Sequence, residues 1–250
     1  MKKILLVFSI LLVLLIAVSA SATPITFTGS SGNLAASATF DVVGVNLQVT
    51  LTNTSLVDVL VPTDVLTAVF FTVAGDPTLT RVSALLNAGS TVFFGGTDPG
   101  GVVGGEWAYE NHIAAPVGAD EGIFSAGFGF NANLRFPGND LQAPASVDGL
   151  QYGLTSAGDN SATGNTPVTG TNALIQNSVI FTLGGALPVG FDPSTSITNV
   201  SFQYGTALDE PNVPGTPIPE PATMLLLGSG LIGLVGFARK RFKKIVLSAE

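Results

Sequence analysis

The chain has 250 residues, no cysteine, one histidine and only 10% charged residues. The absence of cysteine excludes a disulfide framework, a thiol nucleophile and a cysteine-based metal site. Between Thr23 and Pro219 there are 15 acidic residues against only Arg81 and Arg135, and this net charge of -13 excludes nucleic acid as a partner because it repels phosphates.

Residues 1–22 have the three parts of a secretory signal peptide. Two lysines precede the apolar run Ile4–Val18, and small residues follow it, with Ala20 and Ala22 fitting the A-x-A rule. We therefore expect export through the Sec translocon and removal by signal peptidase after Ala22. The alternative is a retained anchor, for which the apolar run is short.

Residues 23–210 are predicted to form one all-β domain, with a β-sandwich-like or jelly-roll-like architecture. Thr, Val and Phe are abundant, and turn residues interrupt the short apolar stretches roughly every eight to twelve residues. The clearest strand is 45–52, in which apolar and polar residues alternate with period two.

Several other segments are predicted strands, and one is a predicted loop. The run Ala68–Phe71 suits a strand buried on both faces, with a short helix as the alternative. The stretch 156–170 is rich in Gly, Asn, Ser and Thr, which is typical of a long surface loop. The remaining predicted strands are 36–41, 65–74, 92–94, 122–130, 178–183 and 196–204.

The segment 106–112 contains the only Trp and the only His of the chain. Trp107, Tyr109 and His112 could form a ligand patch, since aromatic rings present flat faces to a sugar. The alternative, which we favour, is a strand with Trp107 and Tyr109 packed inward and His112 in a turn.

The motifs of common enzymes are absent. There is no G-x-S-x-G elbow, and one histidine without cysteine cannot build a catalytic zinc site. The carboxylate pairs Asp120–Glu121, Asp209–Glu210 and Glu106 with Glu110 could serve glycoside hydrolysis only at the right separation. Weak Ca²⁺ binding has no loop motif to support it. We therefore expect no enzyme, no cofactor and no catalytic or metal-binding residues.

The C-terminal region is predicted to consist of a spacer, a membrane helix and a basic tail. Five prolines in 211–221 predict an extended spacer of roughly 30 Å. Residues 222–238 are uncharged and just long enough for a single transmembrane helix. The tail 239–250 should remain cytoplasmic, with the body outside, because it carries a basic cluster. This topology stop consists of Arg239, Lys240, Arg241, Lys243 and Lys244.

Pro219, Glu220 and Pro221, followed by the apolar segment and the basic cluster, resemble the PEP-CTERM sorting domain of Gram-negative, biofilm-forming bacteria. The resemblance covers residues 217–244. It implies transient anchoring in the inner membrane, recognition by an exosortase, which is a membrane-embedded cysteine transpeptidase, and cleavage near the Pro-Glu-Pro motif. It also implies delivery to the cell surface or the extracellular matrix.

These features together predict a non-enzymatic exported surface or matrix protein that is associated with the exopolysaccharide of a biofilm. The alternatives are a lectin-like carbohydrate-binding module and a carbohydrate-active hydrolase, which would use Trp107, Tyr109 and nearby carboxylates.

Overall fold

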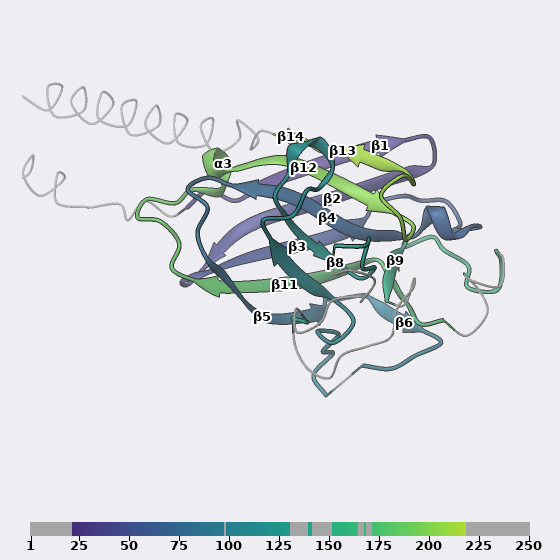
Figure 1. Cartoon of the computed structure of the whole chain (residues 1–250). Helices are drawn as coiled ribbons and strands as arrows, with labels where there is room; N and C mark the ends of the chain where they lie inside the picture. Colours follow the sequence, from purple (N-terminus) through teal and green to yellow (C-terminus); the bar gives the residue numbers. More distant parts are fainter. Residues whose placement is uncertain are drawn as a thin grey trace, which may run out of the picture. The chain divides into compact units, whose positions relative to one another are not determined.

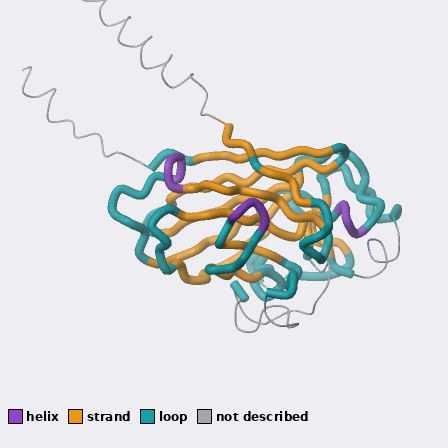
Figure 2. The backbone as a smooth tube through the Cα atoms, turned by 45° about the horizontal axis from the view of Figure 1, so that its top comes forward, coloured by secondary structure: helices purple, strands orange, loops and turns teal. Residues whose placement is uncertain are grey.

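The body of the chain folds as two β-sheets that share one hydrophobic core. The computed structural model describes residues 22–97, 99–130, 140–141, 152–164, 168 and 172–218. Nearly all of the regular structure is β-strand (Figure 1). The strands run alongside one another, and loops gather at their ends (Figure 2). The predicted all-β class is confirmed.

The first sheet has six strands in the order β14-β1-β2-β3-β11-β5. Strands β1, β2 and β3 follow one another as antiparallel hairpins, whereas β11 comes from much later in the chain to lie between β3 and β5. The bounds are β1 (Ile25–Ser31), β2 (Leu34–Val43), β3 (Asn46–Asn53), β5 (Leu79–Leu86), β11 (Ser178–Gly185) and β14 (Thr216–Ile218).

The second sheet has the order β13-β12-β4-β9-β10-β6, and β8 pairs with both β4 and β7. Among the described strand pairs of this sheet, β9 and β10 are parallel and the others are antiparallel. Its strands are β4 (Leu66–Val73), β6 (Thr91–Phe93), β7 (Ala108–Asn111), β8 (Glu121–Phe124), β9 (Gly153–Thr155), β10 (Leu174–Gln176), β12 (Ile197–Tyr204) and β13 (Asn212–Pro214). Among the described residues, helical turns that connect strands are η1 (Pro62–Asp64), η2 (Pro116–Gly118) and α3 (Pro193–Ser196).

The core lies between the two sheets, and strand β3 shows how the sequence forms it. Its burial alternates along the strand, with Leu47, Val49 and Leu51 fully buried. Phe40 of β2 meets Phe71 of β4 from the opposite sheet, with ring centroids 5.1 Å apart. The predicted alternation is therefore confirmed, because a period of two turns one face of β3 toward the second sheet.

Strand β4 is buried on both faces, as its apolar run predicts. Val69 and Phe71 belong to the core between the sheets, whereas Phe70 faces a second apolar cluster on the outer side. In that cluster Phe128 and Phe130 pack edge-on against Phe70, with ring centroids 5.8 and 5.9 Å away. The predicted strand 122–130 ends early, because β8 stops at Phe124 and a turn brings these two aromatic rings back over the sheet.

The predicted spacer 211–221 needs a correction. Six of its first eight residues belong to the sheets, because β13 pairs with β12 and β14 lies beside β1. The prolines are tolerated there because both strands are sheet edges, where a residue without an N–H leaves no neighbouring strand unpaired. The domain therefore extends to residue 218 and does not end at 210.

No helix within the described residues is long and apolar enough to cross a membrane. The predicted transmembrane segment 222–238 and tail 239–250 lie outside the described residues, as does the predicted signal peptide apart from Ala22.

Candidate functional site

The predicted ligand patch is a packed strand. Trp107, directly before β7, has none of its surface exposed, and its ring lies 4.9 Å from that of Phe181 on β11 of the other sheet. Tyr109 on β7 is 2% exposed. A sugar-binding platform requires an accessible ring face, and neither ring offers one. The ligand-patch interpretation is corrected accordingly, since these rings are part of the sandwich core.

His112 lies where the favoured alternative predicts, in the turn that ends β7. Its backbone is left-handed, with φ of 57°, and its side chain is exposed. Its Nδ1 atom lies 3.8 Å from Oδ1 of Asp76, which belongs to the turn between β4 and β5. An exposed pair at this distance contributes little to stability because water screens both charges.

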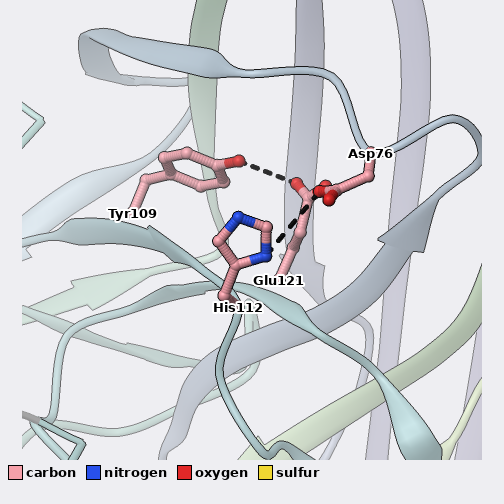
Figure 3. A network of polar contacts seen from close by, with 4 residues as sticks. All are labelled: Asp76, Tyr109, His112 and Glu121. Carbon is pink, nitrogen blue, oxygen red and sulfur yellow. Dashed lines mark hydrogen bonds and ion pairs between the residues drawn. The ribbon is translucent and has the colours of Figure 1, made fainter.

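A buried acid–phenol pair lies beneath this exposed pair. The hydroxyl of Tyr109 donates a 2.8 Å hydrogen bond to Oε2 of Glu121 on β8 (Figure 3). In the register of the two strands Tyr109 is opposite Ile123, so Tyr109 and Glu121 are diagonal neighbours on the same face. Glu121 is only 1% exposed.

The position of Glu121 has a clear electrostatic consequence. Burial raises the pKa of its carboxyl to about 7, and the nearby carboxylates of Asp120 and Asp76 push in the same direction. The hydrogen bond from Tyr109 opposes this rise. Burial and the neighbouring Glu121 likewise raise the pKa of the Tyr109 hydroxyl, which therefore remains a donor at neutral pH.

The sequence contained a signal for this pair. Asp120 and Glu121 form an adjacent carboxylate pair in the sequence, and Glu121 also has the same strand parity as the apolar Ile123. With a period of two, both side chains must point into the sandwich. The sequence does not show that Tyr109 is the partner of Glu121, because Tyr109 lies twelve residues away on another strand.

The predicted loop 156–170 is attached to the fold where it is described. Asp159 is largely buried, and its Oδ1 accepts a 3.0 Å hydrogen bond from the N–H of Val59. Asp58 accepts hydrogen bonds from the hydroxyl of Thr163 and the N–H of Asn160, which lower the pKa of its carboxyl. Among the described residues no three His, Asp or Glu side chains group together as a metal site would require.

The C-terminal strands bring the fold close to the predicted processing motif. Tyr204 N–H donates to the carbonyl of Pro211, and Gly215 N–H donates to Val200 O, at 2.9 and 2.8 Å. A side chain at Gly29 would collide with this segment, since an added Cβ would lie 2.6 Å from the Pro214 carbonyl oxygen. Strand β1 therefore needs glycine at this position for β13 to approach.

The structure describes the chain up to Ile218, directly before the motif. Pro219, Glu220 and Pro221 lie outside the described residues, as do Ala20 and the topology-stop residues. Ala22 is described, at the start of the body.

Comparison with known proteins decides the nature of the C-terminal region. The family model for the PEP-CTERM protein-sorting motif matches residues 217–241. The chain carries a PEP-CTERM sorting motif. No curated protein and no solved structure matches the chain.

The PEP-CTERM motif implies an exosortase-type processing partner and a protein that is exported and passes through a membrane stage. It begins at Pro217, within β14, so motif and fold overlap by two residues. The linker between the folded body and the Pro-Glu-Pro sequence is therefore absent, in contrast to the predicted spacer.

Proposed function

We propose that this chain is a non-enzymatic exported surface or extracellular-matrix protein, which is held at the inner membrane until an exosortase cleaves it near Pro219–Glu220–Pro221. The observation that carries the proposal is the coincidence of two boundaries. The last strand ends at Ile218, and the sorting motif starts at Pro217. A cut within or after the Pro-Glu-Pro sequence would leave every described strand intact.

Release of an intact domain fits the structure of the body. Its last two strands are sheet edges, and Val213 of β13 is buried, so the C-terminal strands belong to the fold and not to the discarded signal. A cut several residues earlier would remove apolar surface from the core and destabilise the product.

Association with exopolysaccharide is part of the same proposal, and it comes from the sorting signal and not from a recognised sugar site. The lectin-like alternative depended on ring faces of Trp107 and Tyr109 that are buried. The hydrolase alternative is no better supported, because Asp58 and Asp64 line one pocket whose volume of about 10 Å³ is far too small for a sugar ring. Neither alternative is taken further.

The test is mass spectrometry of the mature C-terminus, from cells with the exosortase and from cells that lack it. We expect a C-terminus between residues 218 and 222 in the first strain and an intact tail in the second. Glu220→Ala should block processing, whereas the matched control Asp209→Ala, which replaces an exposed acid eleven residues before Glu220, should not. An identical tail in both strains would reduce the motif to a simple anchor.

Matrix association needs a separate measurement. In a strain that exports the protein but makes no exopolysaccharide, we expect the processed body to move from the matrix fraction to the culture medium. Equal retention in the two strains would remove exopolysaccharide from the proposal and leave export and processing untouched.

A further inference from the structure

The pocket that is too small for a sugar lies where the two sheets meet the β1–β2 turn and η1. Its volume of about 10 Å³ is enough for a single water molecule. Both sheets contribute to its wall, since Leu34 and Asn53 belong to β2 and β3 of the first sheet, and Tyr204 belongs to β12 of the second. We call this pocket the Tyr204 cavity.

The hydroxyl of Tyr204 needs a hydrogen-bond acceptor. Tyr204 has none of its surface exposed, and its hydroxyl oxygen forms no hydrogen bond within the described residues. The N–H of Ala35 is close enough to act on this hydroxyl, but an N–H is a donor and cannot accept the phenolic proton. A buried O–H group without an acceptor is costly, and such groups in folded proteins are usually satisfied by an ordered water.

Other polar side chains in the wall of the Tyr204 cavity already have partners. Asn53 donates to the carbonyl of Leu154 and accepts from the N–H of Ser55, at 3.1 Å in both cases. The hydroxyl of Ser55 donates to the carbonyl of Asn33 at 2.7 Å. Asp58 is occupied by the loop contacts described above. The proton of Tyr204 is therefore the group that determines what the cavity can hold.

Asp64 of η1 offers the second contact. Its Oδ2 atom accepts from the N–H groups of Leu60 and Val61, both at 3.3 Å, which leaves Oδ1 as a further acceptor. Burial raises the pKa of the Tyr204 hydroxyl, and the negative charge of Asp64 adds to the rise. The two groups thus interact through space without a direct hydrogen bond, and both line the cavity. Polar groups at such a separation are commonly bridged by water.

We propose that the Tyr204 cavity is a hydration site, in which one buried water accepts the hydroxyl proton of Tyr204 and donates a hydrogen bond to the carboxylate of Asp64. This water joins β12 of the second sheet to η1, beside the β1–β2 turn of the first sheet, and is a structural part of the fold. The inference is independent of the proposed sorting and processing.

Water fits the cavity better than a metal ion does. A cation cannot accept a hydrogen bond, so it would leave the proton of Tyr204 without an acceptor. The described part of the chain also gathers no three His, Asp or Glu side chains around this point. A water molecule, in contrast, can accept from the phenol and donate to a carboxylate at the same time.

A high-resolution crystal structure of the body, residues 23–218, tests the site directly, since this body contains both sheets and the core that they share. We expect one density peak at about 2.7 to 2.8 Å from the Tyr204 hydroxyl and from a carboxylate oxygen of Asp64. Several oxygens at about 2.3 to 2.6 Å from the peak would identify a cation and overturn the proposal. Absence of a peak, or a Tyr204 hydroxyl that donates to a protein atom, would overturn it as well.

The variant Tyr204→Phe provides a second readout. Its crystals should lack the peak, whereas the peak should remain in the matched control Tyr152→Phe, which removes a hydroxyl that donates to the Gly96 carbonyl at 2.8 Å. In urea titrations we expect Tyr204→Phe to raise the equilibrium constant of unfolding by roughly twofold to tenfold, because a bridged hydrogen bond is lost. If the variant is as stable as the wild type or more stable, the hydroxyl is unsatisfied and the hydration site is refuted.

Discussion

Replacement of the buried acid by its amide, Glu121→Gln, should stabilise the protein at high pH. In the folded state the pKa of Glu121 is raised from 4.5 to about 7, chiefly by burial. Below pH 4.5 the carboxyl is protonated in both the folded and unfolded states and costs nothing. Above pH 7 the folded state must bury a carboxylate. The pKa difference corresponds to roughly 3 kcal/mol, by which the wild type loses stability as the pH rises through this range.

Glutamine keeps the shape and an oxygen that can accept from Tyr109, but it never ionises. We therefore expect Glu121→Gln to match the wild type near pH 4.5 and to exceed its free energy of unfolding by roughly 3 kcal/mol near pH 8. The measurement is urea unfolding of the exported body, residues 23–218, at several pH values. Asp209→Asn, which removes an exposed acid, is the control and should follow the wild type.

Tyr109→Phe separates the contribution of the hydrogen bond from that of burial. The Tyr109 hydroxyl lowers the pKa of Glu121, so its removal should raise that pKa further, extend the loss of stability to higher pH and make the loss larger. If Glu121→Gln has the same stability as the wild type at every pH, Glu121 is not a buried acid and the explanation fails. The explanation would also fail if Glu121→Gln were less stable than the wild type at pH 8.

Three further predictions concern the core and the domain boundary. Trp107→Ala should lower the free energy of unfolding by about 3 to 5 kcal/mol in urea titrations, because it leaves a cavity against Phe181. Asn53→Ala should lower it by about 1 to 3 kcal/mol, because Asn53 of β3 donates to Leu154 O of β9 and so connects the two sheets. A body that ends at residue 218 should melt at a higher temperature than one that ends at residue 210, since only the longer body retains β13 and β14. Equal melting temperatures would mean that residues 211–218 add nothing to the fold and act as a spacer.

Strands with a strong pattern could be predicted from the sequence. Strand β3 has the period of two that a half-buried strand requires, and Ala68–Phe71 of β4 has the continuous apolar run of a strand covered on both sides. These signals are local, because each strand needs only its own residues to show which faces are buried.

The elements that were missed depend on distant partners. Strands β9 and β10 have three residues each, too few to show a period. The role of Glu121 depends on Tyr109 from another strand, and a pattern within one segment does not indicate which strands pair. The sorting motif could be predicted because all its parts are local: the Pro-Glu-Pro sequence, the apolar segment and the basic cluster follow one another along the chain.

The prolines of the C-terminal strands suggested a spacer in the sequence, and in the structure they end the pairing of each sheet next to the sorting motif. Pro214 and Pro217 lie in β13 and β14, which are the outer strands of the two sheets. A proline there costs no hydrogen bond inside the sheet, and it denies a further strand one of the donors it would need. The residues that suggested an unpaired spacer therefore close both sheet edges where the body meets its sorting motif. After cleavage, the released domain would already carry edges that resist pairing with another copy.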